Sequence, residues 1–239
     1  MVTLLKEEGV DINTVIPSKC DIKAIKSASS AKVNIVTDMI ALDLAKDMKK
    51  KFNIDYIYFD KHMNKDTIYE NYKKLEELLD IKLLDKLEHK IKEYDELFDK
   101  SSELLNGKKL IYGNTPMMAF ETVDFLSELG MIPVFVQVRE LYEQDIKYKE
   151  NISKKGYNPY VSRIANIAPL RHLYETIGAD IYIGHESPII LKEKGLMQIT
   201  LDSHAQKIGY ELPIGIMKDL IKLLQLDNNK MGGMIYAGM

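Results

Sequence analysis

The residues with the clearest potential for chemistry stand in short polar loops, each directly after a buried-looking apolar run. His185 and Glu186 follow the run Asp180–Ile183, and His204 follows the run Gln198–Leu201. A histidine titrates near neutral pH, so at a ligand site it can donate a proton or a hydrogen bond. His185, Glu186 and His204 are therefore candidate catalytic residues. The alternative for His185 is that it caps the next helix or bonds neighbouring backbone.

A second polar pair, Arg139 and Glu140, follows the apolar run Pro133–Val138. The guanidinium of an arginine can bind a carboxylate through two parallel hydrogen bonds, which makes this pair a candidate for substrate binding. The alternative is an ion pair between Arg139 and Glu140, at the surface or between domains.

A glycine turn follows the apolar run Leu110–Tyr112. Its residues Gly113, Asn114 and Thr115 are candidates for substrate binding, because N–H groups at the start of a helix can bind an anion. Gly184, beside the first histidine, is a further candidate. The turn matches neither the phosphate-binding pattern G-x-x-x-x-G-K-[ST] nor the dinucleotide pattern G-x-G-x-x-G. We therefore expect this chain to bind no nucleotide.

These loops must be positioned by the apolar segments between them. Short apolar runs predict six strands, at residues 32–37, 54–59, 110–112, 133–138, 181–183 and 198–201. Between most of these strands, apolar residues recur at the spacing of a helix. One helix is expected to be capped by Thr115, to have Pro116 as its first residue and to stop at Gly130; two others are expected to open near Pro188 and Pro213. This alternation predicts an α/β fold with parallel sheets, in which ligands bind at the carboxyl ends of the strands.

We expect two Rossmann-like, doubly wound lobes that face each other across a crevice. Residues 1–104 form the first lobe, with a charged helical connector, and residues 105–226 form the second. Residues 227–239 are expected to be a tail. The segment 142–157 combines tyrosines with lysines, and we expect a flexible excursion that covers the crevice or touches a partner.

Composition limits the function classes. Of the 239 residues, 46% are hydrophobic and 29% are charged, which is typical of a soluble globular protein. The net charge of −3 gives no reason to expect binding to nucleic acid. No apolar run is long enough to span a membrane or form a signal peptide, so a cytoplasmic location is expected. Cys20 is the single cysteine, and the histidines show no metal-ligand spacing, so no metal site is expected from this chain alone.

Three stretches of the chain carry a family resemblance. They are GKKLIYGNTPMMAFETVDFLSELGMIPVFVQV at 107–138, GADIYIGHESPIILKEKGL at 178–196 and GYELPIGIMKDLIKLL at 209–224. In this order they resemble the later domains of the nitrogenase component 1 superfamily. The stretch INTVIPSKCDIKAIKSASSAKVNIV at 12–36 is similar to the junction of that family's first and second domains. Within the superfamily, the chain most resembles the catalytic subunit of the nickel-sirohydrochlorin a,c-diamide reductive cyclase of methanogens.

The resemblance implies an oxidoreductase component with a particular set of partners. An ATP-dependent iron–sulfur reductase would deliver electrons to a four-iron four-sulfur cluster, and from there to a tetrapyrrole. Family members carry most cysteine ligands of that cluster in an N-terminal domain that we expect to be missing here. The cluster would then be shared within a homo-oligomer or supplied by a cysteine-bearing partner subunit. The alternative is a non-catalytic scaffold or carrier of a metallocofactor, in which 142–157 and 227–239 are docking surfaces.

Overall fold

The chain divides into two compact units. The first contains residues 1–93 and 207–212, and the second contains residues 94–206 and the residues from 213 onward. The computed structural model describes residues 1–18, 20–113, 115, 117–163 and 168–228. None of the helices in these ranges is long and apolar enough to cross a membrane.

The first unit is built around two parallel strands, β1 (Val33–Val36) and β2 (Asp55–Tyr58). Between them the chain forms the short 3-10 helix η2 (Met39–Ala41) and the helix α3 (Leu42–Phe52). The Asp38 carboxylate accepts a hydrogen bond from the Ile40 N–H and so starts this helical stretch, as a capping aspartate does. The other helical elements of the unit are α1 (Val2–Glu7), α2 (Ile22–Ser27), η1 (Ala28–Ser30), α4 (Lys65–Leu79) and the first part of α5 (Leu84–Leu105).

A late segment of the chain, residues 207–212, returns to the core of this first unit. The ring of Tyr210 stacks on that of Tyr72, with 6.0 Å between centroids, and Tyr72 meets the edge of Phe59 at 4.8 Å. Gly209 lies against the Tyr72 hydroxyl, so closely that a Cβ at this position would be 2.3 Å from the oxygen. The aromatic contacts therefore fix a segment that is distant in sequence from the rest of the unit.

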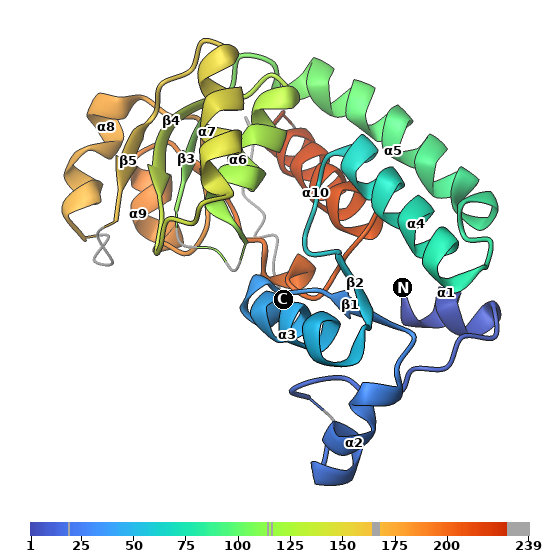
Figure 1. Ribbon diagram of the computed structural model, residues 1–239. Helices are drawn as coiled ribbons and strands as arrows, with labels where there is room; N and C mark the ends of the chain where they lie inside the picture. The colour runs from blue at the N-terminus through green and yellow to red at the C-terminus, as the bar shows by residue number, and fades with distance from the viewer. Residues whose placement is uncertain (19, 114, 116, 164–167, 229–239) are drawn as a thin grey trace. The chain divides into compact units, whose positions relative to one another are not determined.

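The second unit contains a parallel sheet of five strands in the order β5-β4-β3-β6-β7, and Figure 1 labels β5, β4 and β3 of this sheet. Because β3 is both first in sequence and central in the sheet, the strand order reverses between β3 and β6. Such a reversal is the topological switch point of a doubly wound sheet. The expected α/β class with parallel sheets is therefore confirmed. The strands are β3 (Lys109–Tyr112), β4 (Ile132–Gln137), β5 (Tyr160–Ser162), β6 (Ile181–Ile183) and β7 (Met197–Ile199).

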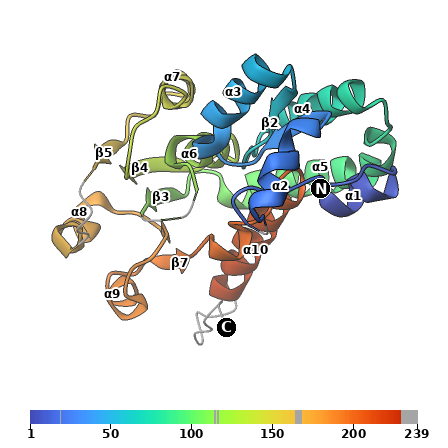
Figure 2. The same cartoon turned by 60° about the horizontal axis from the view of Figure 1, so that its bottom comes forward.

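Helices cover both faces of this sheet. Figure 2 shows α6 and α7 on one side of the strands and α8 and α9 on the other. On the α8/α9 side, Ile111, Tyr182 and Tyr174 belong to one buried apolar cluster. Side chains alternate along a strand, so Leu110 and Tyr112, also buried, point to the opposite face. The helical elements are α6 (Ala119–Glu128), α7 (Asp145–Lys154), η3 (Ala168–His172), α8 (Tyr174–Ile177), α9 (Pro188–Glu193), η4 (Asp202–His204) and α10 (Glu211–Asn228).

Two predictions about this unit are wrong. The helix after β3 does not start at Thr115: it begins at Ala119, after Met118 in extended conformation. Thr115 instead bonds locally, with its hydroxyl accepting from the Met117 N–H at 3.1 Å. Pro116 lies outside the described residues.

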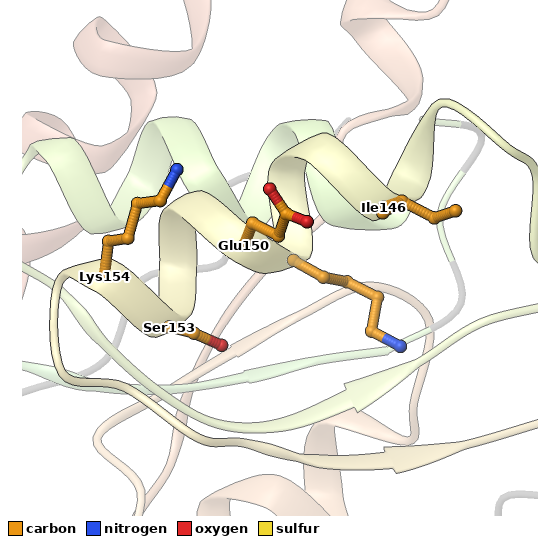
Figure 3. A pocket seen from close by; sticks show the side chains of 5 residues that line it. Ile146, Glu150, Ser153 and Lys154 are labelled. Atoms are coloured by element: carbon orange, nitrogen blue, oxygen red, sulfur yellow. The ribbon is translucent and has the colours of Figure 1, made fainter.

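The segment 142–157 is also not a flexible excursion, because most of it forms α7. Its last turn is fixed to α6: Asn151 donates to the buried Asp124 carboxylate at 3.0 Å, and Lys155 pairs with the same group at 2.5 Å. Figure 3 shows that Ile146, Glu150, Ser153 and Lys154 line a shallow depression on the outside of this helix. Residues 229–239 of the expected tail lie outside the described residues.

Candidate functional site at the carboxyl ends of three strands

The carboxyl ends of β3, β6 and β7 are fixed to one another by backbone hydrogen bonds. We call this place the switch edge. Gly113, directly after β3, donates its N–H to Ile183 of β6 at 2.7 Å. Gly184, directly after β6, donates its N–H to Ile199 of β7 at 2.8 Å. The first residues of the loops after β3 and β6 are therefore held to the neighbouring strand by backbone hydrogen bonds.

Gly113 is required here by its neighbour rather than by a ligand. A Cβ on Gly113 would lie 2.3 Å from the hydroxyl oxygen of Tyr182, a fully buried residue of β6. The Gly113 N–H is already bonded to the Ile183 carbonyl and is therefore not available to an anion. Asn114, which was expected to share that role, lies outside the described residues.

Thr115 is buried and shares a hydrogen bond with the Tyr112 hydroxyl. Burial raises the pKa of Tyr112 to about 12, so the phenol stays protonated and keeps this bond at neutral pH. The Thr115 hydroxyl is thus used within the turn, together with the Met117 N–H. Substrate binding by Gly113 and Thr115 stays a prediction. The helix start that suggested it lies elsewhere, because α6 begins at Ala119.

Glu186 is the most heavily bonded carboxylate at the switch edge. Its side chain is 1% exposed. It accepts two hydrogen bonds from Arg171, at 3.1 and 2.8 Å, one from the Tyr174 hydroxyl at 2.9 Å and one from the Ser187 N–H at 2.6 Å. Burial by itself would raise the pKa of Glu186, but these donors together hold its pKa below the ordinary value. An ionised, saturated acceptor of this kind anchors a loop and is poorly suited to donate a proton.

His185, the preceding residue, has the opposite environment. Its side chain is 57% exposed, and its Nε2 lies 2.8 Å from a carboxylate oxygen of Asp202 in η4. The loop beneath it is held by Gln198, whose amide donates to the carbonyls of Gly184 at 2.9 Å and Glu186 at 3.0 Å. The imidazole is therefore both accessible to solvent and held in one orientation. The Asp202 carboxylate fixes the orientation of the ring through Nε2.

His204 follows β7 as expected but is buried, with a side chain only 3% exposed. Its Nε2 lies 2.8 Å from a carboxylate oxygen of Asp219 on α10. Since Asp202 and His204 belong to the same 3-10 turn, the His204–Asp219 pair holds in place the carboxylate that orients His185. The structure thus connects the two histidines through η4 and gives them different surroundings.

Arg139 and Glu140 lie on the exposed loop after β4. The Tyr142 hydroxyl donates to the Glu140 carboxylate at 2.8 Å, so this carboxylate is bonded within its own loop. Their expected role in substrate binding stays a prediction.

Four residues of the switch edge were not expected from the sequence: Arg171, Tyr174, Asp202 and Asp219. Arg171, Tyr174 and Asp219 come from other elements, so no local motif marks them, whereas Asp202 directly follows the predicted strand 198–201 and had the same signal as His204. Tyr182 could have been noticed in the sequence, because it lies at the centre of the predicted strand 181–183, which is followed by Gly184 and His185.

The chain's own residues do not fit an iron–sulfur cluster. Such clusters are held mainly by cysteine thiolates, commonly four. This sequence has one cysteine, Cys20, whose thiol donates to the Pro17 carbonyl at 3.1 Å. These residues could therefore supply at most one thiolate to such a cluster.

Comparison with known proteins gives a consistent result. The family model for nitrogenase component 1 type oxidoreductases matches residues 1–222. Among solved structures, the chain is similar to nitrogenase Cp1 at pH 6.5, with a TM-score of 0.75 and 15% identity over 98% of this chain. It is also similar to nitrogenase Cp1 at pH 5, with a TM-score of 0.67 and 16% identity over 98% of this chain.

The chain spans 57% and 55% of the length of those two nitrogenase chains. No curated protein gives a significant sequence match. Proteins of the matched family typically bind iron–sulfur clusters, work with a separate reductase component and form oligomers. Because the family model covers nearly the whole sequence, this chain belongs to the nitrogenase component 1 type oxidoreductase family.

Proposed function

We propose that this chain is the substrate-facing part of a nitrogenase-like oxidoreductase that reduces a tetrapyrrole in the biosynthesis of the nickel coenzyme of methanogenesis. Electrons would come from an ATP-dependent iron–sulfur reductase, through a cluster whose ligands lie at least partly on a partner chain. Family membership supports the redox class. The tetrapyrrole is supported by the sequence resemblance to the reductive cyclase.

One observation carries the chemical part of this proposal: the accessible, oriented imidazole of His185 at the topological switch point. Reduction of a conjugated ring consumes protons as well as electrons, and a protein must deliver those protons at fixed positions. An imidazole changes its protonation state near neutral pH, so it can donate a proton and recover it from solvent. Asp202 fixes Nε2, which leaves Nδ1 of His185 as the nitrogen that can face a ligand.

The roles of the neighbouring residues follow from their surroundings. Glu186 anchors the loop of His185 through Arg171 and Tyr174 and does not itself transfer a proton. His204 acts indirectly, by holding η4 against α10 through Asp219. We therefore assign proton delivery to His185 alone and positioning to Glu186 and His204.

The alternative is a scaffold or carrier that binds a metallocofactor without converting it. The docking surface of this alternative would include the depression on α7, where Ile146 is 58% exposed beside lysine side chains.

Anaerobic turnover separates the two functions. The chain is purified with its co-purifying partners and mixed with nickel-sirohydrochlorin a,c-diamide, the iron–sulfur reductase and ATP. We expect a saturable change in the tetrapyrrole absorption spectrum and a reduced product. His185→Gln should retain binding and lose most turnover, while His89→Gln, at an exposed position on α5, should behave as wild type.

Binding without turnover by the intact complex would favour the carrier function. The absence of both binding and turnover would refute the tetrapyrrole proposal. Equal turnover by His185→Gln and wild type would remove His185 as the proton donor.

A further inference from the structure

Arg171 is held at the switch edge by one side of its guanidinium. Its Nε donates to one Glu186 oxygen at 3.1 Å and its Nη2 donates to the other at 2.8 Å. A guanidinium has five N–H donors, so this bidentate bond leaves both donors of Nη1 and one of Nη2. The Glu186 side chain is buried, whereas 39% of the Arg171 side chain is exposed. The outer side of the guanidinium, turned away from Glu186, is therefore the hydrated side.

Glu186 prepares this outer side for binding in two ways. It fixes a long side chain that would otherwise lose much of its rotamer freedom on binding a ligand. It also offsets part of the Arg171 charge, so binding of an anion depends on the hydrogen bonds of the guanidinium as well as on its charge. What remains is a planar pair of N–H donors, whose spacing matches a carboxylate in particular.

The location connects this donor pair with the proton donor. Glu186 directly follows His185, and both come directly after β6. A large ligand with several carboxylates, as a tetrapyrrole is, can bind Arg171 through one carboxylate and reach the imidazole at the same edge of the sheet. We propose that Arg171, rather than Arg139, binds a carboxylate of the substrate at the switch edge. The inference rests on the proposed function for the identity of the substrate, and on the geometry of Arg171 for the binding chemistry.

A purely structural role is the competing explanation: Arg171 would connect η3 to the β6 loop and bind nothing else. The conservative variant Arg171→Lys separates the two. A lysine keeps an ion pair with Glu186, and so keeps the loop anchored, but it cannot offer two parallel donors to a second carboxylate. Arg163→Lys, at an exposed position after β5, makes the same chemical change away from Glu186 and is the matched control.

The experiment is an absorbance titration with nickel uroporphyrin, which has eight carboxylates, and with its fully amidated derivative. Wild type and Arg163→Lys should prefer the carboxylate form by about tenfold or more, the effect expected of a charged bidentate hydrogen bond. Arg171→Lys should lose most of this preference while keeping the wild-type circular dichroism spectrum and thermal midpoint. If Arg171→Lys does not fold, the double variant Arg171→Gln/Glu186→Gln replaces the ion pair with neutral groups of similar shape, and the same loss is expected.

An undiminished preference in folded Arg171→Lys would overturn the inference, as would a larger loss in Arg139→Lys. A second measurement distinguishes this failure from failure of the proposed function. Citrate is titrated into protein labelled with ¹⁵N arginine, and the side-chain N–H signals of Arg171 are followed. If these signals shift while neither tetrapyrrole binds, the carboxylate site stands and the tetrapyrrole function fails. If they stay unchanged and neither tetrapyrrole binds, both are refuted.

Discussion

The close contact between Gly113 and Tyr182 gives the sharpest test of how the switch edge is built. An alanine at position 113 would place its Cβ 2.3 Å from the Tyr182 hydroxyl oxygen, 2.6 Å from Cζ and 2.9 Å from Cε1. All three distances are shorter than a carbon can tolerate without movement. Tyr182 is fully buried and packs edge-on against Tyr174, with 5.8 Å between ring centroids, so it has little room to move away.

The magnitude follows from two opposing effects. Gly113 does not have the positive φ that favours glycine, so its backbone accepts alanine, which by itself would stabilise the protein by about 0.4–1 kcal/mol through the unfolded state. Overpacking of a rigid core costs about 1–3 kcal/mol, and three short contacts place this case near the upper end. We expect Gly113→Ala to lower the free energy of unfolding by about 2 kcal/mol.

Urea unfolding followed by circular dichroism measures this change, and a double-mutant cycle assigns it. Tyr182→Phe alone should change stability by less than about 0.5 kcal/mol, because the neighbouring Tyr174 hydroxyl keeps its hydrogen bond to Glu186. Combined with Gly113→Ala it should restore only part of the loss, about 1 kcal/mol, since the contact with Cζ remains.

Gly178→Ala is the control for backbone strain without crowding. Gly178 has φ +62, and no atom of the described residues lies within 4 Å of its Cβ position, so alanine should cost about 1 kcal/mol regardless of the residue at 182. A change below about 0.5 kcal/mol for Gly113→Ala, or no coupling to Tyr182→Phe, would refute the steric explanation of this glycine.

Three further predictions concern the ionisable groups. Glu186→Gln should destabilise the protein by about 1–3 kcal/mol at neutral pH, because a buried carboxylate that accepts four hydrogen bonds loses its charge. The pKa of Glu186 is lower in the folded protein than its ordinary value of 4.5. The ionised carboxylate therefore contributes its full stabilisation above pH 4.5, and this stabilisation is lost as the pH falls through the lower folded pKa. Acid unfolding of the variant should lack that part of the pH dependence. Asp219→Ala should cost about 1–2 kcal/mol, measured by thermal unfolding, since it removes the carboxylate bonded to the buried His204. Asp202→Asn should change stability by less than about 0.5 kcal/mol, because both members of its pair with His185 are half exposed, yet it should reduce turnover several-fold; unchanged turnover would show that Asp202 does not orient the imidazole.

Much of the second unit follows from local sequence pattern. The runs Leu110–Tyr112 and Ile181–Ile183 are short, apolar and followed by glycine, and the structure confirms both as strands of one parallel sheet. Once these strands are placed side by side, chain order alone puts His185 at their carboxyl edge. Pro188 likewise begins α9 as expected, because its fixed φ and missing N–H suit the first turn of a helix.

Other features depend on contacts between distant residues and left no local signal. The polar helix α7 depends on Asp124 of α6, which binds both Asn151 and Lys155. The return of residues 207–212 to the first unit depends on the stacking of Tyr210 on Tyr72. Arg171 is fifteen residues from Glu186, and nothing in the intervening sequence indicates that they meet.

The contrast between His185 and Glu186 shows why residue type and position at a strand end do not assign a chemical role. Both titratable side chains follow the same strand, and the sequence suggests acid–base chemistry for each. The chain buries one and surrounds it with four hydrogen-bond donors, which stabilise its charged form and remove its capacity to give up a proton. The His185 side chain, by contrast, is about half exposed, and its Nε2 is held by Asp202. A proton donor must exchange its proton with ligand and solvent, and of these two residues only His185 meets that condition.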